Sequence, residues 1–186
     1  MYATNEFRKG LKVEIDGEPF LMVESQFVKP GKGQAFTRTK LKSLISGNVI
    51  DRTYKSGEKV AKAPVEETDM QFLYSTGEEY NFMDLNSYET IAIQKDQLDD
   101  AWKWLKESLE VKILLYKGRP ISVDLPNFVA LEVTYCEPGA KGDTAQGATK
   151  VAELESGTSV NVPLFINQGE TLKIDTRTGQ YVERVK

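Results

Sequence analysis

The sequence predicts an all-β protein built from three small domains. Short segments in which apolar and polar residues alternate follow one another along the 186 residues, separated by turns rich in Gly and Pro. Hydrophobic residues make up 40% of the chain, which is enough to build real cores. Breaks at 61–64 and 125–126 divide the chain into thirds, and we predict domains at 1–63, 64–125 and 126–186.

The first third is expected to form a small, bent β-barrel with a protruding hairpin. Its N-terminal half alternates cleanly, and Asp16–Pro19 is typical of a tight turn. The loop 29–33 reads Lys-Pro-Gly-Lys-Gly and is rich in residues that break regular structure. We expect the strands of this domain at 11–15, 20–28, 34–41 and 49–55. If Phe36 and Leu41 point inward, Lys40 and Lys42 should point to solvent.

The middle third predicts five strands and one helix, the pattern of an oligonucleotide-binding (OB) barrel. The helix is expected at 96–107, with aspartates at its start, where the helix dipole favours negative charge. Leu98, Trp102 and Leu105 then form an apolar stripe, which places Trp102 in the core, whereas Trp104 points elsewhere. We expect the strands at 70–74, 80–83, 90–93, 109–116 and 121–123.

The last third again has the outline of a five-strand barrel. Its first expected strand is followed by a long loop, 138–149, that contains three glycines. Cys136 is expected to serve as a small core residue. The strands are predicted at 128–135, 150–154, 160–166, 171–174 and 181–185.

The composition argues against an enzyme. The chain has no histidine and a single cysteine, and it contains neither a phosphate-binding loop motif nor a dinucleotide-binding motif. We therefore expect no catalytic residues, no metal and no cofactor. No apolar run approaches the roughly 20 residues of a membrane span, and the N-terminus lacks the apolar core of a secretory signal. Together with the lone cysteine, this predicts a cytoplasmic protein without membrane association.

Charge is distributed unevenly along the chain. Residues 1–63 contain 12 Lys and Arg against 7 Asp and Glu, whereas residues 64–125 contain 6 against 13. The stretch from Ser25 to Ile50 contains no acidic residue. A basic end on an acidic body favours an oriented approach to a polyanion. The alternative is that this stretch is merely a solvated surface with a chance bias in charge.

Several motifs match one family in the same order along the chain. The segment 29–36 reads Lys-Pro-Gly-Lys-Gly-Gln-Ala-Phe, and the segment 150–169 contains Val-Asn-Val-Pro-Leu-Phe-Ile-Asn-Gln-Gly. Further matches lie at 16–19, 120–123, 126–129, 141–145 and 175–182. Over essentially its full length, the chain resembles the bacterial translation elongation factor P family.

The resemblance implies a translation-protein barrel of the SH3 or KOW type followed by two OB barrels, in a bent, tRNA-like arrangement. It implies a factor that binds the 70S ribosome between the P and E sites and stimulates peptide-bond formation at consecutive prolines. Lys32 would be modified with β-lysine by a lysyl-tRNA-synthetase-like ligase, since lineages with Arg at this position use a sugar instead. We expect a monomer.

The expected partners of the chain are P-site peptidyl-tRNA and mRNA. The tip motif and the acid-free stretch supply the residues expected to bind the tRNA, because cationic side chains and glycine-exposed backbone suit RNA phosphates. These tRNA-binding residues are Lys29, Gly31, Lys32, Gly33, Arg38, Lys40 and Lys42. The resemblance also implies that the loop formed by Gly142, Asp143 and Thr144 contacts mRNA in the E site.

Two other classes of protein remain open from the sequence. One is a generic single-stranded RNA-binding protein built from the same barrels, which would bind free RNA without a ribosome. The other is an enzyme that works with carboxylates alone, although no motif marks its pocket. At the level of single residues, Lys32 could be an ordinary solvated lysine, and Asp143 could simply hold a turn through its side chain.

Overall fold

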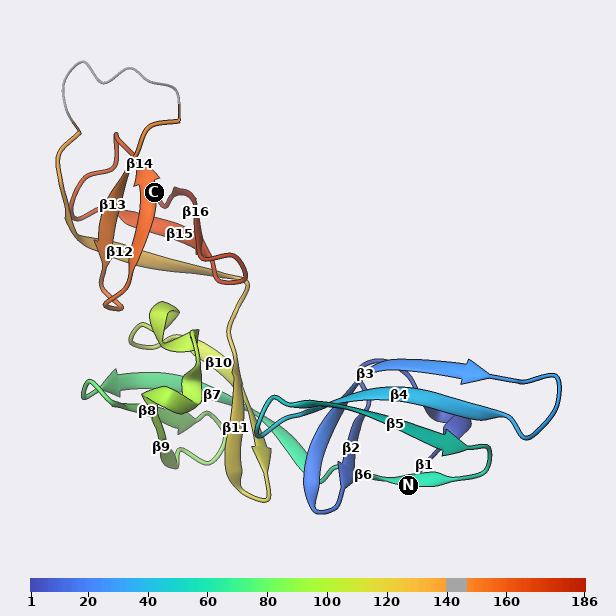
Figure 1. Ribbon diagram of the computed structural model, residues 1–186. Helices are drawn as coiled ribbons and strands as arrows, with labels where there is room; N and C mark the ends of the chain where they lie inside the picture. Colours follow the sequence, from blue (N-terminus) through green and yellow to red (C-terminus); the bar gives the residue numbers. More distant parts are fainter. Residues whose placement is uncertain (140–146) are drawn as a thin grey trace. The chain divides into compact units, whose positions relative to one another are not determined.

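The computed structural model describes residues 1–139 and 147–186, and over these residues the chain forms sixteen strands and three short 3₁₀ helices. The strands assemble into three separate sheets (Figure 1). The chain folds as two compact units, one made of 1–67 and 114–122 and the other of 68–113 and 123–186. No helix among the described residues is both long enough and apolar enough to span a membrane.

The first sheet has six strands and carries the long hairpin predicted from the sequence. Its strand order is β1, β6, β2, β3, β4, β5. Leu11, Met22 and Leu41 belong to the core beneath it, and Phe7 packs edge-on against Tyr54 at a centroid distance of 5.2 Å. The elements are β1 (Tyr2–Ala3), η1 (Thr4–Glu6), β2 (Lys12–Ile15), β3 (Glu18–Val28), β4 (Phe36–Ser43), β5 (Val49–Lys55) and β6 (Lys59–Lys62).

The second and third sheets share one topology. Each has five strands, and the first strand in sequence lies at the centre between the second and the fourth. This is the strand order of an OB barrel. The second sheet contains β7 (Val65–Ser75), β8 (Glu79–Asp84), β9 (Thr90–Gln94), β10 (Glu110–Tyr116) and β11 (Arg119–Asp124). The third contains β12 (Phe128–Cys136), β13 (Thr149–Leu154), β14 (Ser159–Pro163), β15 (Thr171–Asp175) and β16 (Gln180–Arg184).

The predicted helix at 96–107 is wrong. Two 3₁₀ helices replace it, η2 (Lys95–Leu98) and η3 (Ala101–Trp104). Asp99 separates them with a φ of 50°, a left-handed backbone conformation that no continuous α-helix contains. Of the aspartates that suggested a helix start, Asp96 lies in η2, and Asp99 and Asp100 form the turn between η2 and η3.

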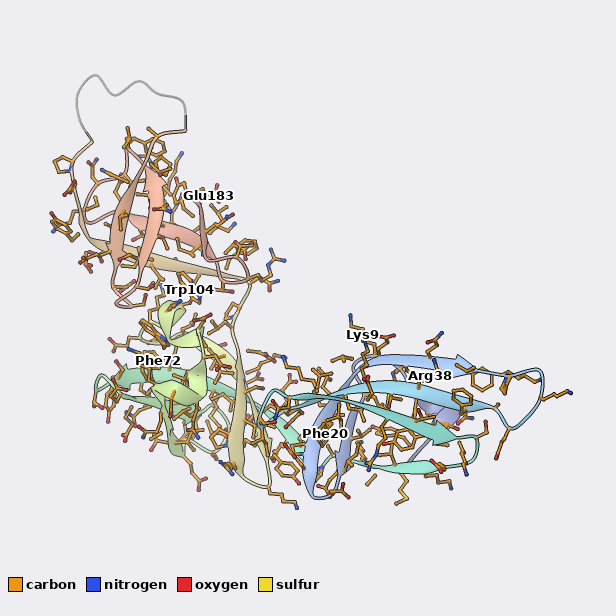
Figure 2. The ribbon with its side chains drawn as sticks, viewed as in Figure 1. Lys9, Phe20, Arg38, Phe72, Trp104 and Glu183 are labelled. Atoms are coloured by element: carbon orange, nitrogen blue, oxygen red, sulfur yellow. The ribbon has the colours of Figure 1, made fainter. Side chains whose placement is uncertain are left out.

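The roles of the two tryptophans are the reverse of those predicted. Trp102 is only half-buried, and the Lys95 ammonium lies 4.1 Å from its ring centroid. Trp104 is buried and belongs to the core of the third sheet, together with Leu131 and Leu172 (Figure 2). The Ser156 hydroxyl donates a hydrogen bond to the Lys103 carbonyl beside it. Cys136 lies in the same core, as predicted.

Part of the predicted linker at 61–64 is a strand. Ala61 and Lys62 belong to β6, which pairs with both β1 and β2. The sequence analysis missed β1 and β6, because strands of two and four residues are too short to show an alternating pattern. The three domain boundaries stay a prediction.

Candidate nucleic-acid interface

The loop between β3 and β4 presents Lys32 without obstruction. The two strands stay paired as far as Val28 and Phe36, and the loop between them protrudes from the sheet (Figure 1). Lys29, Gly31, Lys32 and Gly33 are all exposed. Gly33 has a φ of 103°, a conformation that an L-residue rarely adopts, and a Cβ on Gly31 would meet nothing within 4 Å. The loop therefore leaves the stem of Lys32 uncrowded on both sides.

Strand β4 continues this basic surface away from the tip. Arg38, Lys40 and Lys42 alternate with buried residues and are all exposed, so the three cations share one face of the strand (Figure 2 labels Arg38). We call this face the outer face and the three residues the basic row. The structure thus confirms that Lys40 and Lys42 point to solvent.

The predicted orientation assumed that both Phe36 and Leu41 point inward, and this holds for Leu41 alone. Leu41 is fully buried, as expected. Phe36 lies two residues before Arg38 in the alternating strand, so its side chain is on the outer face with the cations. Its ring centroid is 5.4 Å from the guanidinium carbon of Arg38. At that distance the ring is within reach of a cation–π interaction, which favours one position for the Arg38 side chain.

The cations of the basic row differ in the charge of the residues that face them on the neighbouring strands. Lys40 lies opposite Glu24 on one side and Asp51 on the other, and its ammonium is 3.7 Å from the Glu24 carboxylate. Arg38 instead lies between two neutral residues, Gln26 and Thr53. These four neighbours, together with Arg38 and Lys40, line a shallow groove of about 410 Å³.

The position of Glu24 and Asp51 beside Lys40 is not visible in the sequence. Both residues lie just outside the acid-free stretch, and only the strand register brings them beside Lys40.

The carboxylates with clearly shifted pKa values lie elsewhere in the described chain. Backbone N–H groups of Asn86 and Ser87 lower the pKa of Asp84, and the guanidinium of Arg177 lowers that of Asp175. A lowered pKa keeps a carboxylate ionised at neutral pH and makes it a poor general acid. Within 1–139 and 147–186, no three His, Cys, Asp or Glu side chains cluster as metal ligands would.

The predicted mRNA-binding residues Gly142, Asp143 and Thr144 lie outside the described residues. Their role stays a prediction. The individual roles of the residues in the basic row and in the tip loop, our name for residues 29–33, stay predictions as well.

Family models match almost the whole chain. Residues 3–60 match the elongation factor P KOW-like domain, residues 65–123 match the elongation factor P OB domain, and residues 129–184 match the elongation factor P C-terminal domain. All three models describe parts of one elongation factor, so the chain has the domains of a translation factor.

Relatives over the full chain specify the family. The elongation factor P of Natranaerobius thermophilus is 52% identical and covers all of this chain and 99% of its own length. That of Pelotomaculum thermopropionicum is 51% identical, with both chains fully covered. The chain belongs to the elongation factor P family and is a translation elongation factor that interacts with the ribosome and tRNA.

A solved structure shares part of the fold. The eukaryotic translation initiation factor 5A from Methanococcus jannaschii superimposes with a TM-score of 0.54 at 24% identity. The match covers 66% of this chain and 94% of that one.

Proposed function

We propose that this protein binds the 70S ribosome between the P and E sites and positions P-site peptidyl-tRNA, which relieves stalling at consecutive prolines. The observation that carries the proposal is the placement of Lys32. It lies in an exposed loop, between two glycines, at the end of a hairpin whose outer face carries the basic row. A long cationic side chain at the end of a narrow arm can reach a site that a globular domain cannot enter.

The proposed mechanism is one of positioning. A proline ring fixes φ and makes the incoming amine a constrained nucleophile. Holding the acceptor end of the P-site tRNA in a reactive pose lowers the entropic part of the barrier, and the ribosome supplies the chemistry. In this proposal Lys29, Arg38 and Lys42 hold the tRNA phosphates, and the tip glycines allow close approach of the backbone.

We further propose that Lys32 carries a β-lysyl group added by a lysyl-tRNA-synthetase-like ligase. The ligase first activates the carboxyl group of β-lysine as an adenylate, with release of pyrophosphate from ATP. The neutral Nζ of Lys32 then attacks that carboxyl carbon, an amide bond forms, and AMP and a proton leave. The exposure of Lys32 supports this step, since a ligase must reach Nζ.

The remaining parts of the proposal concern the oligomeric state, the cellular compartment and the contact with mRNA. The protein acts as a monomer in the cytoplasm, and the segment Gly142–Thr144 contacts mRNA in the E site. Backbone amides, a carboxylate and a hydroxyl are groups that can read the base edges of single-stranded RNA.

A reconstituted translation assay tests the function. Protein purified from its native host is added to ribosomes that translate a template with three consecutive proline codons, and full-length product is timed. We expect faster synthesis on this template and no change on a matched template in which alanine replaces the prolines. Equal rates with and without the protein on the proline template would contradict the proposal.

Intact-mass measurement with peptide mapping tests the modification. We expect the native protein to exceed its sequence mass by one lysyl residue, with the increase confined to the peptide that contains Lys32. An unmodified Lys32 in protein from growing cells would contradict this part of the proposal while leaving the positioning role open.

A further inference from the structure

A second pocket lies on the face of the β3–β4 hairpin opposite the basic row. Antiparallel pairing places Phe27 opposite Thr37 and Gln26 opposite Arg38. Because side chains alternate along a strand, Phe27 and Thr37 project from one face and Arg38 from the other. The pocket on the Phe27 face has a volume of about 680 Å³. That volume is within the range of about 300–1,000 Å³ that is usual for ligand pockets.

Phe27 gives this pocket an unusually exposed aromatic wall. Its side chain is 64% exposed, although its backbone is paired with that of Thr37, one pair before the end of the hairpin ladder. Phe7 forms another part of the lining and is held in place by its edge-on contact with Tyr54. The ring of Phe7 therefore packs against the core, whereas the ring of Phe27 is open to a flat partner on its face.

The lining of the pocket contains no charged side chain. Apart from the two phenylalanines, the lining residues supply hydroxyl, amide and backbone groups, which can donate and accept hydrogen bonds. The full lining consists of Ala3, Thr4, Asn5, Phe7, Ser25, Phe27, Thr37, Ser56 and Gly57. A neutral pocket with an open aromatic face and many hydrogen-bonding groups suits a planar, uncharged, polar ligand.

Residues next to the pocket lining carry charge of both signs, since the Glu6 carboxylate accepts a hydrogen bond from the backbone N–H of Ala3 in the lining, and two cations follow the phenylalanines along the chain. Arg8 follows Phe7 directly, Lys29 comes two residues after Phe27, and both are exposed. A ligand that carries negative charge on a flexible backbone and neutral rings beside it would match both features. RNA with an unpaired base has this chemistry, since the base can stack on an aromatic ring while its phosphates contact cations.

We propose that the Phe27 pocket binds one unpaired nucleobase of the RNA that the hairpin engages. The base stacks on the exposed face of Phe27, and the polar groups of the lining bond to its edge. The hairpin then contacts RNA through both faces. Phosphates lie against the outer face, and a base lies in the pocket on the Phe27 face. This inference rests on the proposed function for its RNA partner, but the pocket can be tested without a ribosome.

Titration of the free protein with short RNA tests the pocket. Amide NMR spectra are followed while an eight-nucleotide adenylate oligomer is added, and separately an oligomer with the same backbone but no bases. We expect shifts at Phe27, Thr37 and Ser56 with the adenylate oligomer and little change there with the baseless one. Phe27→Ala should weaken binding of the adenylate oligomer by on the order of tenfold, the effect of one lost stacking contact.

Two further variants separate stacking from packing. Phe27→Tyr keeps a ring and should bind as the wild type does, whereas Phe27→Leu keeps an apolar side chain and should bind as Phe27→Ala does. Tyr74→Ala removes another exposed aromatic side chain, from β7, and should change nothing. Equal shifts with both oligomers, or unchanged binding by Phe27→Ala, would overturn the proposal. The proposal would also be overturned if the amide signal of Phe27 shifted with protein concentration in the absence of RNA. Such a shift would mean that a second copy of the protein fills the pocket.

The translation assay distinguishes failure of this inference from failure of the proposed function. If the wild type does not accelerate the proline template, the proposed function is wrong, whatever the oligomer titration gives. If the wild type accelerates it and the titration shows no base-dependent binding, only the pocket is wrong.

Discussion

Single side chains on the hairpin differ in how freely their charge can meet RNA. Lys40 is already neutralised in part by Glu24 at 3.7 Å and lies opposite Asp51, whereas Arg38 has neutral neighbours across both strand pairs. A cation that must give up an ion pair before it contacts a phosphate gains less from that contact. The three residues of the basic row should therefore not contribute equally.

Substitutions along the basic row test this inequality. We expect Arg38→Gln to weaken ribosome binding more than Lys40→Gln does, and to weaken it equally for all P-site tRNAs. Loss of one phosphate contact should also reduce the slope of log affinity against log salt by about one unit. Ribosome affinity measured over a range of salt concentrations checks both effects. Unchanged affinity and slope for Arg38→Gln would show that the row is a solvated surface.

Asp84 makes part of the stability depend on pH. Its carboxylate accepts hydrogen bonds from the backbone N–H groups of Asn86 at 2.7 Å and Ser87 at 3.1 Å, and these bonds lower its pKa. A carboxyl group whose pKa is lower in the folded protein stabilises the fold above its unfolded pKa. That stabilisation is lost as the pH falls through the folded pKa.

We therefore expect Asp84→Ala to lower the free energy of unfolding at neutral pH. The difference from the wild type should shrink as the pH falls below about 4, the ordinary pKa of aspartate. Asp84→Asn keeps an acceptor without the charge, so its deficit at neutral pH should be smaller. It should shrink on acidification by the same amount as that of Asp84→Ala, because only the wild-type carboxylate titrates. Urea unfolding at pH 7 and pH 3 checks both variants. A deficit of Asp84→Ala that persists undiminished at pH 3 would contradict the electrostatic explanation.

At the level of elements, η3 ties the second sheet to the third. Trp104 is 7% exposed and lies in the core cluster of the third sheet. Gly179, in the turn between β15 and β16, faces this ring, and a Cβ there would lie 3.3 Å from the ring carbon Cζ2 of Trp104. Glycine at this position therefore serves both the left-handed turn and the close approach of the indole.

Substitution of this glycine separates the two roles. Gly179→Ala should lower the free energy of unfolding by about 1–2 kcal/mol for the positive φ, plus a further loss because the indole must move. Gly157→Ala provides the matched control, because Gly157 has a φ of 89° and would meet nothing within 4 Å. Urea unfolding followed by tryptophan fluorescence measures both. Equal losses in the two variants would show that the Trp104 contact does not matter.

The same elements show how far the sequence predicts the fold. The alternating segment 11–15 predicts a strand correctly, because a half-buried strand imposes a period of two. The segment 96–107 satisfied every local criterion for a helix, yet Asp99 turns the chain and Trp104 packs in the core of another sheet. Contacts between distant segments decide such cases, and a short window of sequence does not contain them.

The candidate site was predicted in part for the same reason. The motif around Lys32 indicated an exposed loop, and the alternation of β4 placed Lys40 and Lys42 in solvent. Neither the acidic partners of Lys40 nor the pocket beside Phe27 could be predicted, because both arise from strand pairing. A register shift of one residue would reverse every face of the hairpin.

At the scale of the whole molecule, the residues proposed to bind tRNA all lie in the N-terminal third of the sequence. The first sheet carries the tip loop and the basic row, whereas the segment 64–125 contains 13 acidic residues against 6 basic ones. Such a distribution favours approach to a polyanion through the first domain, because local potential steers an encounter more than net charge does. The account therefore depends above all on Lys32, the residue at the end of that domain's hairpin.

Lys32→Ala in the translation assay tests this central claim most directly. The variant should keep the fold, with a change in the free energy of unfolding of at most about 0.5 kcal/mol, because Lys32 makes no core contact. It should nevertheless lose the acceleration on the template with three consecutive proline codons. Lys9→Ala, which removes another exposed lysine of the same domain, should retain it. Full acceleration by a folded Lys32→Ala protein would contradict the account.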